Sequence, residues 1–477
     1  MYALIYFDTE DFISPPESVV HRLPGQLADV MHKHGLSGCF HIMGEKARFM
    51  ERHGQADVIE SVRRHDVSLH YDRGSLHPTT AEEVSQLDWF PAVERVLFRE
   101  VPGFQALERI FGKCSGLTQH GGTFAAPIVY AAGKLGKPFL YSPFRLPGRN
   151  VVWWCNNLLI GGYQAPFYFD QFYRDTPKFE QSLAKVDGYL AERAEAFDFT
   201  AMFGCHPVIT MMQRFPDGIN FSNGASPRPS EWVAPTPVDG VSIPRILTNF
   251  ERLVKALVTQ SNVQWTTVAG IRDLYGQRPV RVTDDVVLQG AKAVVVHGGP
   301  TWTPALSAGE LLFLLARRAV ERSDAYPVPQ VMGPTREADG AVRTTSPDLD
   351  LGAVAREIVE AVMGCGYLPP ALGAASGGIA PELALVLLAG QAVGERVAPD
   401  PERLTVDAIP GVAEATEKVR GYRKWRVHGE QYHQDGIVNP FRLQAWTLKP
   451  AFAADEYPEG VRLGRHLNPM VETEDWT

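Results

Sequence analysis

Three carboxylates stand within four residues, directly after an apolar run near the start of the chain. Tyr2-Ala-Leu-Ile-Tyr-Phe7 is typical of a buried strand, and Asp8-Thr9-Glu10-Asp11 follows it at once. Carboxylates this close repel one another unless a cation lies among them. The group therefore predicts either a metal site or a solvated loop whose acids cap the next helix.

Histidines occupy comparable places later in the chain. His70 and His77 share one loop after an apolar segment, His206 ends another such segment, and His120 precedes two glycines. Neutral imidazole is a good ligand for zinc and similar divalent ions, although a lone histidine is more often structural. Acids after one strand and histidines after three other segments are what the mouth of an α/β barrel would gather into one site.

The elements that would position these residues alternate between strand-like and helix-like patterns. This alternation predicts the α/β class, with a parallel sheet or barrel and helices outside it. The expected strands are 2–7, 38–43, 67–70, 139–142, 151–160, 199–206 and 263–268. The expected helices are 26–34, 57–64, 179–197 and 244–259.

The alternation of strand-like and helix-like patterns ends near residue 276. Residues 280–297 are expected to form two short strands around a Gln-Gly turn, with helices after them. Segments 312–320 and 385–393 match at six of nine positions, at a fixed offset of 73 residues. This favours a duplicated helical unit, although Leu- and Ala-rich helices also match by chance. Three regions are therefore expected, a barrel, a mainly helical accessory domain and an unassigned extension: 1–276, 277–400 and 401–477.

Composition narrows the function classes. The 45% hydrophobic and 21% charged residues describe a soluble globular protein, and no apolar stretch is long enough to span a membrane. A net charge of −9 without a basic block argues against nucleic acid as a partner and favours a glycan or a neutral or cationic small substrate. Five widely spaced cysteines argue against a disulfide framework and against a cysteine-based zinc site.

The order of the motifs resembles that of the NodB-type polysaccharide deacetylases, a carbohydrate esterase family. The segments similar to the family's motifs are Asp8–Asp11, Cys39–Ala47, His65–His70, Ala201–Pro207 and Trp265–Arg272. The resemblance implies a distorted (β/α)7 NodB-type barrel over residues 1 to about 275. It also implies metal-dependent hydrolysis of an N-acetyl (amide) group on an amino sugar or polysaccharide.

The metal site that the resemblance implies holds a divalent ion, and its ligand types favour zinc. The expected ligands are Glu10 or Asp11 together with His70 and His77. The family usually has three residues between its two histidines, whereas six separate His70 and His77. The second histidine ligand is therefore displaced, replaced by Asp72, or lost.

The catalytic roles that the resemblance implies fall on three further residues. Asp8 would take the proton of a water whose pKa the ion lowers to about 7, and His206 would give a proton to the departing amine. His120 would orient the substrate or assist His206.

Two other functions stay open. The third motif of the family carries an arginine and prolines, whereas Gln119-His120-Gly121-Gly122 stands there in this chain. This departure leaves room for a non-catalytic carbohydrate-binding protein on the same barrel. The other alternative is a cytoplasmic amidohydrolase that acts on a small amide or cyclic imide.

The accessory region has a resemblance of its own. Segments 306–320 and 355–369, with 379–393, resemble the helices of the pseudomurein-binding repeat, a cell-wall-binding module. No secretion signal is visible, which predicts a cytoplasmic protein, or a cell-wall-associated one if a leader was removed. In a cytoplasmic protein, the helices of the accessory region would cover the barrel or join two copies in a homo-oligomer.

Overall fold

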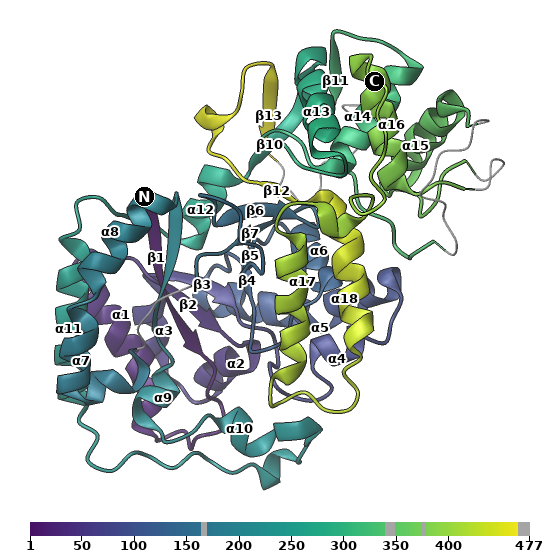
Figure 1. The fold of residues 1–477 in the computed structure, drawn as a ribbon. Coiled ribbons are helices and arrows are strands. Elements are labelled where there is room, and N and C mark those ends of the chain that lie inside the picture. Colours follow the sequence, from purple (N-terminus) through teal and green to yellow (C-terminus); the bar gives the residue numbers. More distant parts are fainter. Residues whose placement is uncertain (164–168, 339–348, 374–377, 466–477) are drawn as a thin grey trace.

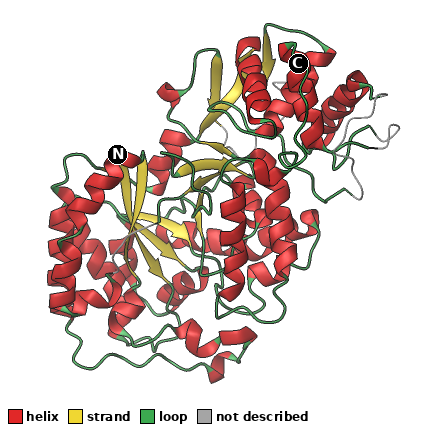
Figure 2. Ribbon diagram, viewed as in Figure 1, coloured by secondary structure: helices red, strands yellow, loops and turns green. Residues whose placement is uncertain are grey.

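The computed structural model describes residues 1–163, 169–338, 349–373 and 378–465. Its first half is a curled sheet of mainly parallel strands with helices packed around it (Figures 1 and 2). Parallel pairing joins β5, β4, β3, β2, β1 and β8 in that spatial order, and β9 also pairs with β1. The sheet consists of β1 (Tyr2–Thr9), β2 (Cys39–Ile42), β3 (Asp66–Leu69), β4 (Leu117–Thr118), β5 (Phe139–Leu140), β6 (Val151–Trp154), β7 (Asn157–Ile160), β8 (Phe199–Cys205), β9 (Gln264–Trp265) and β12 (Lys449–Pro450). The predicted fold class, a distorted α/β barrel followed by a smaller, mainly helical region, is confirmed.

The helices around the sheet bury one face each against it. In α11, the buried positions Ile246, Phe250, Leu253 and Leu257 recur every three or four residues, as an amphipathic helix requires. The helices of this half are α1 (Leu23–Lys33), α2 (Gly44–Arg52), α3 (Ala56–Arg63), α4 (Thr80–Val84), α5 (Trp89–Phe111), α6 (Ala126–Lys134), α7 (Thr176–Leu183), α8 (Val186–Ala196), α9 (Pro207–Met211), α10 (Pro216–Asn220), α11 (Ile243–Val258) and α12 (Val268–Tyr275).

One expected strand is a hairpin. Residues 151–160 form the antiparallel strands β6 and β7, which turn at Cys155 and Asn156. Both turn residues have a φ of 50°, as the two-residue turn of a tight hairpin demands. The prediction of a single strand was wrong because it gave no weight to Asn156, a residue type that tolerates this left-handed backbone.

The accessory region begins with a strand and continues with helices. β10 (Gln277–Thr283) is flanked in antiparallel fashion by β11 (Ala325–Pro327) and β13 (Val461–Arg465). Helix α13 packs against α16, and α14 packs against α15, in a cluster beside the barrel (Figure 1). These helices are α13 (Asp284–His297), α14 (Ala308–Val320), α15 (Leu351–Cys365) and α16 (Pro381–Val393). The two matching sequence segments lie in α14 and α16.

The second of the two strands expected within 280–297 is the helix α13. Asp284 and Asp285 occupy its first turn, and Gly298 ends it with a φ of 73°. Both features stabilise a helix, since acids complement its positive N-terminus and glycine adopts the left-handed terminal position. Gly290 also lets α13 approach α14 closely, because a Cβ there would lie 2.1 Å from Leu311 Cδ2. The prediction of a strand was wrong because it gave the valines at the end of the segment more weight than these helix signals.

The chain then returns to the barrel. Helices α17 (Val412–Gly421) and α18 (Gln434–Leu443) pack against each other, and α18 also contacts α4 and α6 (Figure 1). Strand β12 then joins the barrel sheet beside β6. Part of the region expected to be a separate extension therefore lies on the barrel itself. Among the described residues, none of the helices combines the length and the apolar character needed to cross a bilayer.

A buried ion cluster joins the barrel to the accessory region. Lys449 Nζ of β12 lies 2.8 and 2.7 Å from the two carboxylate oxygens of Glu310 in α14. Arg278 Nη1 of β10 lies 3.8 Å from the same carboxylate, and all three side chains are buried. Glu310 also caps its own helix by accepting a bond from the backbone N–H of Ser307 at 2.8 Å.

We expect Glu310→Gln to lower the free energy of unfolding by about 3 kcal/mol or more, because a neutral amide keeps the cap but leaves two buried cations without an anion. Chemical denaturation followed by circular dichroism measures this change. The matched control is Glu321→Gln, which breaks an exposed ion pair with Arg317 and should cost less than about 1 kcal/mol. Equal small effects of both substitutions would show that the buried cluster does not stabilise the fold.

Candidate active site

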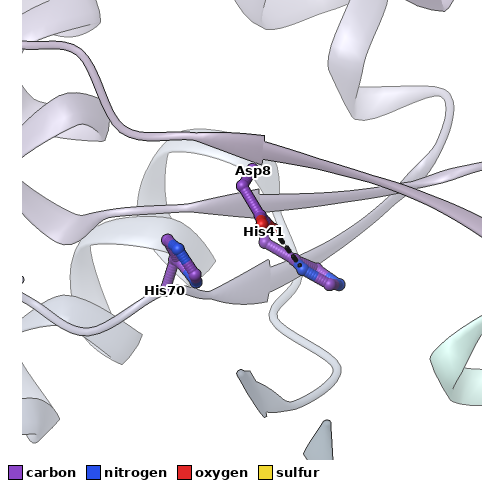
Figure 3. Close-up of side chains that lie close together, drawn as sticks. All are labelled: Asp8, His41 and His70. Carbon is purple, nitrogen blue, oxygen red and sulfur yellow. Dashed lines mark hydrogen bonds and ion pairs between the residues drawn. The ribbon is translucent and has the colours of Figure 1, made fainter. Parts of the chain in front are cut away.

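The candidate site lies where three neighbouring parallel strands end. Asp8 of β1 is the direct register partner of His41 of β2, and Glu10 follows the end of β1. His70 follows the end of β3, the next strand along the sheet (Figure 3). Side chains at one register position point to the same face, so these groups converge at the carboxyl edge of the sheet.

Asp8 is held in place by a histidine of the neighbouring strand. His41 Nδ1 lies 2.8 Å from Asp8 Oδ1, and the His41 side chain is fully buried (Figure 3). Burial alone would raise the pKa of Asp8, but His70, His41 and His206 together outweigh it and lower that pKa. Asp8 is therefore an ionised carboxylate at neutral pH, in a fixed orientation.

Glu10 lies between two buried imidazoles. Its Oε2 atom is 3.5 Å from His70 Nε2 and 3.2 Å from His120 Nε2. Burial opposes ionisation of Glu10, but the contacts with His120 and His70 outweigh burial and lower its pKa. The three ligand atoms of Glu10, His70 and His120 lie within 4.8 Å of one another, close enough to surround one ion. Asp8, His41 and His70 form a second group of this kind that shares His70.

The two imidazoles of the first group differ in charge preference. Burial is the largest influence on His70 and lowers its pKa, so His70 is neutral and offers a lone pair. Burial acts on His120 too, but hydrogen bonds to Asp217 and Glu10 outweigh it and raise its pKa to about 10. His120 Nε2 lies 3.1 Å from Asp217 Oδ2, which also accepts a bond from the Ser75 hydroxyl at 2.5 Å.

His206 faces Asp8 from the other side of the site. It caps α9 directly after β8, and Asp170 holds both its backbone N–H, at 2.6 Å, and its Nδ1, at 3.0 Å. Its Nε2 lies 3.5 Å from Asp8 Oδ2. Burial would lower the pKa of His206, but Asp170, Glu10 and Asp8 raise it to about 9. A charged imidazolium therefore stands opposite an ionised carboxylate.

These residues border one cavity of about 530 Å³. Among the site residues expected from the sequence, Asp8, Glu10, His70, His120 and His206 all line it. The opposite walls come from α9, α10 and a short segment of the C-terminal region, including Phe215, Asp217, Trp425 and Arg426.

Asp11 and His77 are not brought to this cavity. Asp11 Oδ1 accepts bonds from the backbone N–H groups of Ile13 and Ser14, both at 3.0 Å, and shapes the turn after β1. His77 Nδ1 lies 2.7 Å from Glu82 Oε2, and its Nε2 lies 2.9 Å from the Phe221 carbonyl. His77 thus links α4 to the end of α10 beside the site. The sequence had instead predicted His77 to be a metal ligand.

Four residues of the site were not expected from the sequence. His41 lies within a predicted strand, and nothing in the neighbouring sequence marks it as a site residue. In the structure it is the register partner of Asp8, so its side chain points to the same face of the sheet. Asp170 and Asp217 begin or occupy short helices within long irregular stretches. Trp425 lies in residues 401–477, the extension that the sequence left unassigned, because its position depends on the return of the chain to the barrel.

Comparisons with known proteins found neither a matching family model nor a curated relative. Solved structures do resemble the chain over its barrel half. A protein from Mycobacterium smegmatis assigned as a polysaccharide deacetylase is 11% identical, with a TM-score of 0.35, over 57% of this chain and 89% of its own. A family 4 carbohydrate esterase from Streptomyces lividans in complex with acetate is 12% identical, with a TM-score of 0.30, over 56% and 92%. A pseudoenzyme of the same esterase family from Bacillus anthracis is 10% identical, with a TM-score of 0.26, over 44% and 57%.

We expect Asp170→Asn to bring the pKa of His206 from about 9 down toward its ordinary value of about 6.5, because the amide removes the charge nearest the ring. Histidine NMR signals of chelator-treated protein, followed against pH, measure the change. With its folded pKa raised, His206 contributes stability that is full below pH about 6.5 and is lost as the pH rises through about 9.

The matched control is Asp175→Asn, five residues further along. That side chain caps α7 through the backbone N–H of Lys178, a bond that asparagine can also accept. This substitution should leave the titration of His206 unchanged. A His206 pKa that stays near 9 in the Asp170→Asn variant would contradict the pairing.

Proposed function

We propose that the chain is a metal-dependent hydrolase that removes the N-acetyl group from an amino sugar. The observation that supports this most directly is the convergence of Glu10, His70 and His120 on one wall of the cavity that Asp8 and His206 also line. Two imidazoles and a carboxylate around an open position are the ligand types of a catalytic zinc site, and zinc is the metal we propose.

The burial of these ligands fits a bound cation. Among the described residues, the one polar contact of the His70 side chain is Glu10 at 3.5 Å, and its Nδ1 atom has no hydrogen-bond partner. The Nδ1 atom of His120 is likewise buried without a partner in the described part of the chain. The nitrogens that face Glu10 are the Nε2 atoms of both rings, and a cation bound there would replace the positive charge that Glu10 and Asp217 keep on His120. His120 would lose its Nε2 proton when the cation binds, because an imidazole must be neutral to be a ligand.

Of the two possible ligand groups, we assign the ion to Glu10, His70 and His120. All three border the cavity, whereas His41 of the second group does not. This choice also leaves Asp8 free, oriented by His41 and open to the cavity. His120 then takes the place expected for His77.

A divalent ion at this place supplies Lewis-acid polarisation of an amide carbonyl and a lowered pKa for water beside it. Asp8, kept ionised by its histidine neighbours, accepts the proton of the attacking water as general base. His206, kept charged by Asp170, lies on the side facing Asp8 and donates its proton to the departing amine. An amine is too basic to leave without that proton, so an acid opposite the base is required.

We infer that residues 277–400 form an accessory unit with a duplicated helix pair, because α14 and α16 each pack against the first helix of the other pair. The resemblance to pseudomurein-binding repeats supports glycan binding by this unit. A cytoplasmic location stays a prediction from the sequence.

We expect Asp8→Asn to retain one zinc ion per chain while losing at least about 100-fold in turnover, because the base but no ligand is lost. Glu10→Gln and His120→Ala should lose the ion and the activity together. Plasma mass spectrometry of the dialysed protein measures zinc, and acetate release from N-acetylated chito-oligosaccharides measures turnover.

His77→Gln is the control, since His77 lies outside the ligand group and the glutamine amide N–H can still donate to the Phe221 carbonyl. It should bind zinc as the native chain does. Full activity of Asp8→Asn would remove the proposed base. A native protein that binds glycan but no stoichiometric ion would instead be a carbohydrate-binding protein. Zinc binding without acetate release, but with hydrolysis of a small amide or cyclic imide, would favour the second enzyme class.

A further inference from the structure

A segment of the C-terminal region, residues 425–429 and here called the wall segment, closes one side of the cavity. It packs on the loop that carries His120, and glycines make the contact possible. A Cβ at Gly121 would lie 2.1 Å from the Trp425 ring, and a Cβ at Gly122 would lie 2.7 Å from Trp425 Cβ. The two glycines that follow His120 are therefore matched to the tryptophan.

The backbone of the wall segment is fixed by the barrel loops. The N–H groups of Asn223 and Gly224 donate to the carbonyls of Arg426 and Val427, at 2.8 and 3.0 Å. The N–H of Gly429 donates to Glu82 Oε1 at 2.7 Å. The side chains that the wall segment presents to the cavity are consequently set by the fold.

Two walls of the cavity present the same pair of side-chain types. Trp425 stands at 88° to the His120 ring, with centroids 5.2 Å apart, and Arg426 is its neighbour in sequence. Phe215 stands at 87° to the His206 ring, with centroids 4.9 Å apart, and its neighbour is Arg214. Each wall thus packs one aromatic ring against an imidazole of the site and adds one arginine to the cavity lining.

Neither arginine has a partner in the described part of the chain. Arg214 and Arg426 are both exposed, both line the cavity, and neither guanidinium makes a hydrogen bond or an ion pair there. The carboxylates Asp8, Glu10 and Asp217 of the same cavity are already matched by histidines. A guanidinium group binds a carboxylate or phosphate with paired hydrogen bonds, which makes arginine the common choice for anion recognition.

We propose that the cavity binds an N-acetylated amino sugar that also carries an anionic group, a carboxylate or a phosphate, held by Arg214 and Arg426. The inference rests on the proposed hydrolase function and names its substrate class. The net charge of the whole chain, −9, favours a neutral or cationic ligand, but it describes the distant surface rather than this opening.

The test compares three substrates: N-acetylglucosamine, which is neutral, N-acetylmuramic acid, which carries a carboxylate, and N-acetylglucosamine 6-phosphate. For the native zinc-loaded chain, we expect kcat/KM for one of the two anions to exceed that for the neutral sugar at least tenfold. Which anion is preferred distinguishes carboxylate from phosphate. In Arg426→Gln and in Arg214→Gln, that ratio should fall at least tenfold, mainly through KM.

The matched control is Lys424→Gln, which removes the same charge from an exposed residue next to the wall segment that does not line the cavity. It should leave the ratio as it is in the native chain. An equal kcat/KM for all three sugars, or a ratio unchanged in both arginine variants, would overturn the inference while the hydrolase function stands.

Should no sugar release acetate, the hydrolase proposal fails, and calorimetry still decides the inference. Binding of one anionic sugar that is at least tenfold tighter than that of the neutral sugar, and is lost in Arg426→Gln, supports the anion site. Equal binding of all three, or binding of none, contradicts it.

Discussion

The site depends on one buried carboxylate placed between two buried imidazoles. Glu10 lies 3.5 Å from His70 and 3.2 Å from His120, with all three side chains almost entirely shielded from solvent. Such a group is costly to bury unless charges and hydrogen bonds are matched. The parallel strands β1 and β3 and the loop before α6 must therefore hold these residues against that cost, and the surrounding barrel supplies the packing that does so.

The same constraint explains how roles are divided around the cavity. The carboxylates and histidines of the site orient one another through hydrogen bonds. His41 orients the carboxylate of Asp8, and Asp170 orients the imidazole of His206. The neighbouring groups lower the pKa of Asp8 and raise the pKa of His206. An ionised base and a protonated acid therefore coexist in the cavity at neutral pH. The C-terminal region completes this arrangement from outside the barrel, because Trp425 covers His120 and residues 426–427 bind the loop at residues 223–224.

Local patterns in the sequence were enough to predict the class of fold and several groups of the site. Asp8 lies near the end of a strand that an apolar run reveals, and Glu10, His70 and His206 each follow such a strand. The topology therefore brings them together once the sheet is parallel. Contacts between residues far apart in the sequence could not be predicted from local patterns. His120 and His77 looked alike in sequence, and only the loop geometry separates the one facing Glu10 from the one paired with Glu82. Trp425 enters the site because β12 and α18 return to the barrel, for which the sequence has no local signal.

The position of a bound ion tests the account most directly. A crystal of the native chain soaked in zinc, measured at the zinc absorption edge, gives that position from anomalous difference density. The account predicts one strong peak about 2.0–2.2 Å from an oxygen of Glu10 and from a ring nitrogen of both His70 and His120. A peak held instead by Asp8 and His41, or no peak between Glu10 and the two histidines, would contradict it.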